Sequence, residues 1–253
     1  MNNYKILNDK VVLITGASRG IGAEIAKTFG ENGAKIAIVY LKNKNSAQKT
    51  KRFLESLGTE ADVFCCDISK VNSIKSLLRL VAKRFKKIDI LINNAGVIKQ
   101  TPFDKITERE YDWILNTNLK GAFFMAQFTL SYLLKSRGSI INIASVGGQR
   151  GGPKAPHYSA SKAGIISLTR SLSNLYAPKG VRVNAISPGQ IETEIAKDIF
   201  KTAFYKKEVL PKIPLRRIGK TSDVANAALF LASDLSDYIT GQTINVNGGE
   251  YLG

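Results

Sequence analysis

The alternation of two kinds of segment along the chain constrains its fold more than any other feature. Short segments rich in valine and isoleucine, several of them apolar throughout, alternate with longer segments whose apolar residues recur every three or four positions. The short segments predict strands over residues 11–15, 35–40, 62–66, 88–92, 139–143, 181–186 and 243–246. The longer segments predict helices, as over residues 71–85. Repeated βαβ units of this kind predict an α/β domain with a parallel sheet.

The organisation of the chain predicts one domain over residues 1–253. Of its residues, 44% are hydrophobic, which is enough for one large core, and we find no internal repeat, linker or low-complexity segment. Residues 190–214 interrupt the alternation and contain no predicted strand. A segment at that place in an α/β enzyme is a candidate substrate lid.

Two further helices have recognisable ends. One is expected to begin at Thr107, because Thr107 and Glu110 have the spacing of a capping box. The other carries Tyr158 through Tyr176 and is expected to end before Pro178 and Gly180.

The formal net charge of +17 creates a field that attracts anions. The basic residues are spread along the chain, and the densest stretch, residues 197–220, lacks the interleaved aromatic residues of a single-strand nucleic-acid binder. We therefore predict no nucleic-acid partner and assign the charge mainly to biased composition, with a secondary role in attracting an anionic substrate or partner. No apolar run approaches the length of a membrane span and the N-terminus is polar, which predicts no membrane association and a cytoplasmic location.

Cysteine and histidine are too few for a metal site. Cys65 and Cys66 are adjacent in an apolar stretch, where a disulfide between them would strain the backbone, so we expect two reduced core residues. One histidine and two neighbouring thiols do not furnish a zinc site. That histidine, His157, is next to Tyr158, and imidazole titrates near neutrality, but neighbouring helical residues point about 100° apart. We therefore do not assign His157 as a general base and expect it to line a pocket or cap a helix.

A glycine-rich turn joins the first predicted strand to the first predicted helix: residues 15–22, Thr-Gly-Ala-Ser-Arg-Gly-Ile-Gly. Glycine permits a tight turn and a close approach of the backbone to a pyrophosphate, and the helix N-terminus offers free N–H groups with a partial positive charge. An ordinary strand-to-helix turn is the alternative. The position of this glycine-rich turn between a predicted strand and a predicted helix favours the nucleotide-binding interpretation over that alternative.

Tyr158 and Lys162 are four residues apart and share one face of a predicted helix. A phenol has a pKa near 10, so it exchanges a proton near neutrality only where a nearby cation favours the phenolate. Lys162 is the candidate cation. On its own, this spacing is more often an exposed pair on a helix.

Several motifs occur together in order along nearly the whole chain. They are Gly16, Gly20 and Gly22 of the glycine turn, then residues 93–96 (Asn-Asn-Ala-Gly), 158–162, 187–189 (Ser-Pro-Gly), 238–242 and 247–249 (Asn-Gly-Gly). In these motifs the chain resembles the short-chain dehydrogenase/reductase family. The resemblance implies a single Rossmann-type doubly wound domain with a mainly parallel seven-stranded sheet and helices on both faces. It also implies an NAD(P)-dependent oxidoreductase acting on CH–OH or C=O groups, and a homotetramer.

The resemblance also implies the roles of four residues. Tyr158 exchanges the proton, and Ser145 hydrogen-bonds the substrate oxygen and stabilises its developing charge. Lys162 lowers the pKa of the tyrosine and binds the nicotinamide ribose, and Asn118 supports a water-mediated proton relay to Lys162. Ser145 starting a loop and Asn118 marking a polar kink near Gly121 are the alternatives.

The expected cofactor contacts follow the same motifs. They are Gly16, Ser18, Arg19, Gly20, Ile21, Gly22, Lys42, Asp67, Ile68, Asn94, Ala95, Gly96, Tyr158, Lys162, Pro188, Gly189, Ile191 and Thr193. By resemblance Asp67 and Ile68 contact the adenine; capping of the next helix is a compatible role for Asp67. NAD-specific sites usually have an acid after the second strand, whereas this chain has Lys42 there. Because Arg19 and Lys42 are both positioned to bind a 2′-phosphate, NADP(H) is predicted in preference to NAD(H).

The substrate is less constrained than the cofactor. Residues 213–215 and 245–249 resemble 3-oxoacyl-[acyl-carrier-protein] reductases, in which an acidic carrier would dock on basic residues such as Arg137 and Lys179. Residues 97–102 depart from that pattern, and the loop at 147–151 also resembles enzymes of sugars, polyols or small secondary alcohols. Reduction of a 3-oxoacyl thioester is the first hypothesis and an alcohol dehydrogenase the second. A nucleotide-binding protein without catalysis is the third.

Two other features have structural interpretations. The glycine-rich loop over residues 147–153 is expected to form a substrate wall, with a mobile surface loop as the alternative. Trp113, Phe123 and Phe124 lie in helical patterns and are expected in the core or at an oligomer interface.

Overall fold

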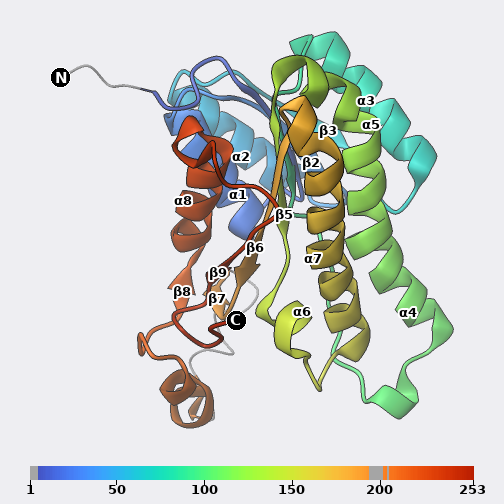
Figure 1. Ribbon diagram of the computed structural model, residues 1–253, viewed down its shortest axis with the longest axis vertical. Coiled ribbons are helices and arrows are strands. Elements are labelled where there is room, and N and C mark those ends of the chain that lie inside the picture. Colours follow the sequence, from blue (N-terminus) through green and yellow to red (C-terminus); the bar gives the residue numbers. More distant parts are fainter. Residues whose placement is uncertain (1–4, 194–201, 204) are drawn as a thin grey trace.

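The computed structural model describes residues 5–193, 202–203 and 205–253, and within these residues seven parallel strands form the central sheet (Figure 1). Their order is β3-β2-β1-β4-β5-β6-β9. The bounds are β1 Val11–Thr15, β2 Lys35–Tyr40, β3 Ala61–Cys65, β4 Ile90–Asn93, β5 Ser139–Ile143, β6 Arg182–Pro188 and β9 Thr243–Val246. The chain winds outward from β1 to β3, then returns to place β4 on the other side of β1. This reversal is the topological switch point at which doubly wound sheets bind ligands.

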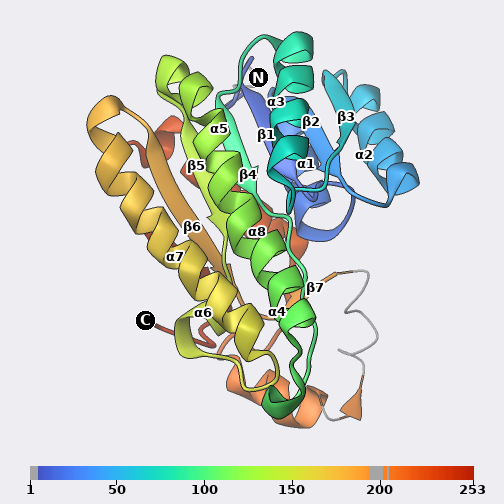
Figure 2. The ribbon, with the colours of Figure 1, turned by 90° about the vertical axis from the view of Figure 1, so that its right-hand side faces the viewer.

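Six helices cover the two faces of this sheet (Figure 2). One face carries α1 Gly20–Glu31, α2 Lys44–Ser56 and α8 Thr221–Ala232, and the other carries α3 Val71–Phe85, α5 Gly121–Ser136 and α7 Pro156–Tyr176. Successive strand residues serve opposite faces: Val12 and Ile14 pack under α1 and α8, whereas Val11 and Leu13 pack under α3 and α5. The apolar strands are therefore buried on both sides, and the predicted fold class is confirmed.

The predicted strands are confirmed with small shifts of their ends, the largest two residues at β4 and β6. The prediction that residues 190–214 contain no strand is wrong, since β7 Ile191–Glu192 pairs with β8 Gly219–Lys220. This pair has only two residues on each side, too few to produce an alternation in the sequence. A β-carbon on Gly219 would lie 2.6 Å from Ile191 Cδ1, so a larger residue there would require the end of the isoleucine side chain to shift. Residues 194–201 and 204 of the candidate lid lie outside the described residues, and the lid stays a prediction.

The predicted helix ends are close to those observed. Thr107 caps α4, Glu108–Leu115, by accepting a 3.2 Å hydrogen bond from Glu110 N. Helix α7 begins two residues earlier than expected, at Pro156, because proline suits the first position of a helix. It ends at Tyr176, and Gly180 then adopts a left-handed conformation with φ +81°.

One expectation about side-chain burial is corrected. Cys66 is buried, but Cys65 is exposed because it ends β3, an edge strand of the sheet. Trp113 is 46% exposed and Phe123 44% exposed, so of the two expected places for them the core is excluded and an oligomer interface stays a prediction. No helix within the described residues is long and apolar enough to cross a membrane.

Candidate active site

The predicted site residues gather where β1, β4, β5 and β6 end. Parallel strands bring their carboxyl ends to one edge of the sheet, so segments distant in sequence become neighbours there. Thr15 ends β1 and Asn93 ends β4, next to the glycine turn and to Asn94. Ser145 follows β5 by two residues, and Pro188 ends β6.

The turn after β1 is held to the loop after β4 by a hydrogen-bond network. Thr15 Oγ1 donates to Ile92 O over 3.2 Å and accepts from the backbone N–H groups of Asn94 and Ala95, both at 3.0 Å. The Asn94 side chain donates back to Thr15 O at 2.8 Å and to Gly16 O at 3.2 Å. The two loops therefore form one rigid support, which explains why Asn94 is needed there.

The glycine turn has the geometry of a phosphate site. Gly16 has φ +68°, and a β-carbon on it would lie 2.9 Å from Ala95 Cα, so only glycine fits. Helix α1 begins at Gly20 with no side-chain cap and no acidic residue in its first turn. Its first N–H groups remain available to an anion. These features fit the pyrophosphate of a dinucleotide.

A cavity of about 390 Å³ lies beside this turn and includes four predicted cofactor contacts: Ser18, Arg19, Gly20 and Thr193. Thr193 is brought from the far end of the chain to the turn, with its Cγ2 3.6 Å from the β-carbon position of Gly20. Lys42 does not line this cavity, whereas Lys49 of α2 does. Sequence reasoning missed Lys49 because an exposed lysine on a polar helix face carries no signal of its own.

Asp67 does not cap α3, and this alternative is corrected. Its Oδ1 accepts from Ser69 N at 3.0 Å and Ser69 Oγ at 2.6 Å, while the N-cap position belongs to Lys70. This is a local turn of the type that aspartate often forms. Ile68 is buried and packs against Gly121, where a β-carbon would lie 2.9 Å from Ile68 Cδ1.

Tyr158 and Ser145 face each other across the active-site edge. Ser145 caps the short helix α6, Val146–Arg150, and its Oγ accepts from Gly147 N at 3.1 Å. Burial raises the pKa of Tyr158, and a hydrogen bond with the Ser145 hydroxyl partly opposes this rise. The phenol is therefore protonated at neutral pH and can donate a proton.

Lys162 is buried, and its Nζ donates to Ile143 O over 2.6 Å at the end of β5. Desolvation lowers the pKa of its ammonium to about 8. Its Nζ lies 5.8 Å from the centre of the Tyr158 ring, so the two side chains are neighbours, as the helical spacing predicts. The expectation that Lys162 lowers the tyrosine pKa is not met in this structure, because burial dominates and raises it.

Asn118 lies in a π-helical turn, Asn116–Lys120, between α4 and α5. Its Oδ1 accepts from Val97 N at 2.8 Å, and its Nδ2 donates to Val97 O at 2.9 Å and Ser161 Oγ at 3.0 Å. A β-carbon on Gly96 would lie 3.4 Å from Asn118 Oδ1 and 3.5 Å from Lys162 Nζ, so these two groups flank the same glycine. Such π-helical turns frequently mark functional sites.

The segment after β6 closes the other side of the site. Gly189 N donates to Val246 O over 3.0 Å, and a β-carbon on Gly189 would lie 2.7 Å from Asn247 Cβ. Ile191 is buried in β7. In the glycine-rich loop, Gly148 packs against the backbone of Lys162 and Gly152 against Ser159 Oγ. Its glycines allow α6 to lie directly on α7, which is consistent with a shaped wall.

His157 does not cap α7, whose N-cap residue is Ala155, and it lines neither the cavity beside the glycine turn nor the one beside β9. It is buried, and its Nε2 lies 3.1 Å from Glu110 Oε1, on α4. No sequence pattern indicates this pair, because the two residues are 47 positions apart.

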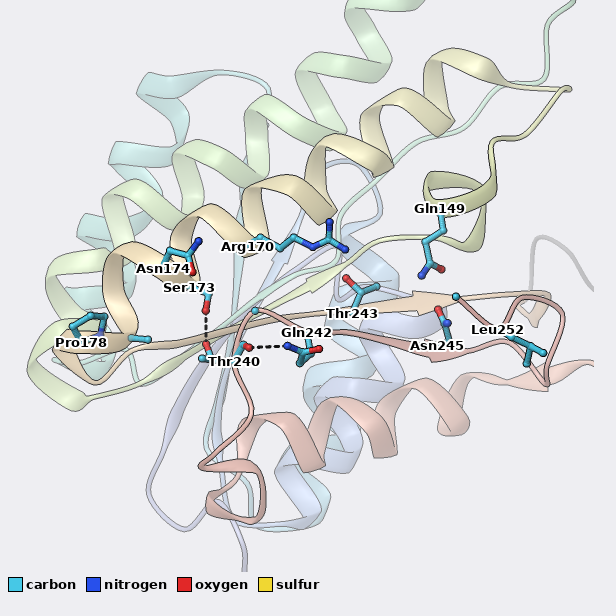
Figure 3. A pocket seen from close by; sticks show the side chains of 13 residues that line it. Gln149, Arg170, Ser173, Asn174, Pro178, Thr240, Gln242, Thr243, Asn245 and Leu252 are labelled. Carbon is cyan, nitrogen blue, oxygen red and sulfur yellow. Dashed lines mark hydrogen bonds between the residues drawn. The ribbon is translucent and has the colours of Figure 1, made fainter.

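A second cavity, of about 820 Å³, lies between α7 and the outer edge of β9 (Figure 3). Its lining is largely polar, with Gln149, Arg170 and Asn245 around it and a 2.9 Å hydrogen bond between Ser173 and Thr240 at one end. None of the predicted catalytic or cofactor residues lines this cavity.

Comparison with known proteins agrees with this arrangement. The sequence profile of a family described as enoyl-(acyl carrier protein) reductase matches residues 16–250. The 3-oxoacyl-[acyl-carrier-protein] reductase FabG of Staphylococcus epidermidis is 38% identical over 96% of this chain and 100% of its own length. The enzyme of that name from Thermotoga maritima is 38% identical over 96% of this chain and 98% of its own.

Solved structures are similarly close. A structure described as a short-chain alcohol dehydrogenase from Sinorhizobium meliloti has a TM-score of 0.93 at 37% identity, with 98% of each chain covered. One described as a 2-deoxy-D-gluconate 3-dehydrogenase from Agrobacterium tumefaciens, with bound NADP, has a TM-score of 0.87 at 33% identity and covers 98% of this chain and 99% of its own. The profile, the full-length relatives and the shared fold show that this chain belongs to the short-chain dehydrogenase/reductase family of oxidoreductases, which act on CH–OH and C=O groups with a nicotinamide cofactor.

Proposed function

We propose that this protein reduces 3-oxoacyl thioesters with NADPH, using Asn118, Ser145, Tyr158 and Lys162. The observation that carries the proposal is the convergence of Ser145, Tyr158 and Lys162 at the edge of the sheet that also holds the glycine turn. The similarity to two 3-oxoacyl-[acyl-carrier-protein] reductases over almost the whole chain favours the thioester substrate.

The proton chemistry follows from the geometry of the side chains. The bound NADPH supplies the hydride. Tyr158, which burial keeps protonated, donates its hydroxyl hydrogen to the ketone oxygen as negative charge develops there. Ser145 donates a second hydrogen bond to the same oxygen. A partly buried, water-poor site strengthens both interactions.

Lys162 and Asn118 return a proton to Tyr158 and hold the neighbouring parts of the site in position. Because its pKa of about 8 is close to neutrality, the Lys162 ammonium releases a proton more easily than an exposed lysine does. Asn118 fixes the backbone of Val97 with two hydrogen bonds and lies beside Lys162 at Gly96. This arrangement supports a water-mediated relay between the two side chains.

The preference for NADPH follows from charge around the glycine turn. Arg19 and Lys49 both line the cavity beside the turn, where Glu24 forms an ion pair with Lys27 and the other acid is Glu192. The residue after β2 is Leu41, followed by Lys42, rather than an acid. A 2′-phosphate would gain charge-assisted hydrogen bonds there, whereas an acid would repel it. The related structure with bound NADP is consistent with this preference.

An acidic carrier protein would dock at a basic cluster formed by Arg137 and Lys179. The two exposed residues are neighbours, because the Arg137 side chain packs against Gly180 within 3.1 Å of its β-carbon position. They lie at the far ends of α5 and α7, about 30 Å along α7 from Tyr158.

This geometry is compatible with a homotetramer. Trp113 and Phe123 expose large apolar surfaces on α4 and α5, and β9 is hydrogen-bonded to β6 alone among the described strands. Aromatic residues of this kind are enriched at protein interfaces. Light scattering measures the number of subunits directly, and a monomer would contradict the proposed homotetramer.

The test of the proposed function is steady-state turnover on acetoacetyl thioesters, with NADPH and NADH in parallel. We expect turnover with both cofactors and a lower KM for NADPH. The same assay with keto sugars, polyols and simple ketones is the comparison. No turnover of any thioester would refute the proposed substrate.

The second candidate is a sugar, polyol or small-alcohol dehydrogenase. Arg150 at the end of α6 forms a 2.6 Å ion pair with Glu250, whose side chain is only 5% exposed. A charged pair beside the predicted substrate wall suits a hydroxylated substrate better than an acyl chain. Preferential turnover of keto sugars in the same assay would establish this function.

A further inference from the structure

Glu110 is a buried carboxylate that the proposed reaction does not use. It occupies the third position of α4, and its side chain is 8% exposed. Oε2 contacts Lys99 Nζ in the loop after β4, and Oε1 lies 3.1 Å from His157 Nε2 in the first turn of α7. The hydrogen bond from Lys99 is the main cause of the lowered pKa of the Glu110 carboxyl, so the group is charged. One side chain thereby joins three elements.

The sequence predicts a different use for this carboxylate. In a capping box, the third residue of a helix bonds to the backbone N–H of the N-cap residue. At α8, Asp223 does this, because its carboxylate accepts from Lys220 N at 2.7 Å. At α4, Thr107 makes its half of the box, but the Glu110 carboxylate turns instead toward Lys99 and His157. The Glu110 carboxylate therefore does not make the second hydrogen bond of the capping box, which indicates that its contacts with Lys99 and His157 serve another function.

Lys99 and His157, two of the groups that bond to the Glu110 carboxylate, are both adjacent to groups of the proposed mechanism. Lys99 is two residues from Val97, whose backbone N–H and C=O both form hydrogen bonds with the Asn118 side chain. His157 immediately precedes Tyr158. A backbone hydrogen bond of 3.1 Å from Thr101 N to Lys154 O also ties this loop to the approach to α7.

The first turn of α7 depends on this contact. The turn has no side-chain cap and no acidic residue of its own. Because a carboxylate can only accept, His157 Nε2 carries the hydrogen in its contact with Glu110. His157 Nδ1 is buried without a hydrogen-bond partner among the described residues, so the bond to Glu110 is what fixes its ring.

We propose that Glu110 is a positioning residue, which holds Tyr158 and Asn118 in their reactive arrangement through His157 and Lys99. The inference rests on the proposed catalytic roles of those two residues. A displacement of reacting groups by about 1 Å lowers a rate by as much as 100-fold, so a distant tether of this kind has a measurable effect.

The test compares Glu110→Ala and Glu110→Gln with wild-type protein on the substrate that wild type turns over best. Glu110→Ala should lower kcat on the order of 10- to 100-fold and raise the primary isotope effect of deuterated NADPH, because hydride transfer becomes slower. The dissociation constant for NADPH should change less than about threefold, since the glycine turn is untouched. Glu110→Gln should recover most of the rate, because an amide accepts from Lys99 and donates to a His157 of the other tautomer.

Asp89 provides the matched control. It is also a buried carboxylate, and it bonds Val11 N at 2.8 Å and Lys87 Nζ at 3.0 Å, at the amino ends of the strands. Asp89→Ala should lower Tm and leave kcat and the isotope effect unchanged. If Glu110→Ala behaved like Asp89→Ala, with a lower Tm and normal kcat, Glu110 would be structural only and the proposal would be wrong.

Lys99→Met keeps the proposal testable if Glu110→Ala does not fold. The Lys99 side chain is 58% exposed, so its replacement should not prevent folding. We expect kcat to fall about threefold to tenfold, because one tether is lost, with at most a small decrease in Tm, because Glu110 keeps its contact with His157. An unchanged kcat would overturn the proposal. A wild-type protein that turned over no carbonyl substrate would instead refute the proposed function.

Discussion

The two ends of the site use different parts of the chain. At the glycine turn the backbone supplies the groups that face a ligand: Gly16 adopts φ +68° against Ala95, and α1 begins without a side-chain cap. At the other end, the groups that face a substrate belong to the side chains of Ser145, Tyr158 and Lys162.

The difference between the two ends predicts which measured property a substitution at each end should change. Apart from the charged residues Arg19 and Lys49, a backbone site tolerates side-chain changes that leave the turn intact, but it does not tolerate a β-carbon at Gly16. A side-chain site keeps its shape when one functional atom is removed, because the helix α7 and the strand β5 that carry it are buried in the core. Substitutions at the first end should therefore change cofactor affinity and stability, and those at the second should change kcat.

Tyr158→Phe should have the largest effect. Removal of the proton donor should lower kcat on the order of 1,000-fold or more, because general acid catalysis contributes about 10² to 10⁴ and Ser145 cannot replace the donor. The dissociation constant for NADPH, measured by fluorescence, should stay nearly unchanged. Tyr176→Phe, on the same helix but beside Lys179, is the control and should keep full activity. An active Tyr158→Phe enzyme would exclude the proposed role.

Gly16→Ala should have the converse effect. The new methyl group would meet Ala95 Cα at 2.9 Å in a left-handed backbone, so we expect a loss of about 2–4 kcal/mol in the free energy of unfolding and weak binding of NADPH. Gly58→Ala is the matched control, because φ is +75° there but a β-carbon meets nothing within 4 Å. It should lose only about 1 kcal/mol and bind NADPH normally. Denaturant unfolding measures the stability, and a binding titration measures the affinity for NADPH. Equal losses of stability in Gly16→Ala and Gly58→Ala would contradict the close contact at Gly16.

The contrast also explains what the sequence can predict. The strands, the layers and the positions of Gly16, Ser145, Tyr158 and Lys162 were predictable, because they depend on periodicity and on motifs of short range. The two-residue pair β7–β8 was not, since it is set by a long-range contact between Ile191 and Gly219.

Electrostatic properties were the hardest to predict. The helical spacing of Tyr158 and Lys162 is confirmed, but the pKa of the tyrosine depends on burial, which the spacing does not report. Similarly, the Thr107–Glu110 spacing predicts a cap, while the partners of the carboxylate, Lys99 and His157, come from loops and helices placed only by the fold.

Arg19→Ala and Lys49→Ala sharpen the comparison at the backbone end, where charge rather than shape selects the cofactor. Arg19→Ala should raise the dissociation constant for NADPH about 10- to 100-fold and leave that for NADH nearly unchanged, because a charge-assisted contact to a phosphate is lost. Lys49→Ala should have a smaller effect in the same direction. Lys42→Ala distinguishes Lys42, which the sequence predicts as a phosphate contact, from Lys49, which lines the cavity. If Lys42→Ala raised the dissociation constant for NADPH more than Lys49→Ala does, Lys42 would be the phosphate contact.

The least direct effect concerns the stability of the cofactor-free protein at alkaline pH. Desolvation lowers the Lys162 pKa from 10.5 to about 8 in the folded state, so between these pH values the unfolded chain binds one more proton at this residue. Stability contributed by Lys162 should therefore rise with pH across that window, by at most about 1.4 kcal/mol per pH unit, and be constant below pH 8. The difference in unfolding free energy between wild type and Lys162→Met isolates this contribution from other titrating groups. A difference that falls or stays flat from pH 8 to 10.5 would show that the ammonium is not desolvated, and that the side-chain end of the site is wetter than its geometry implies.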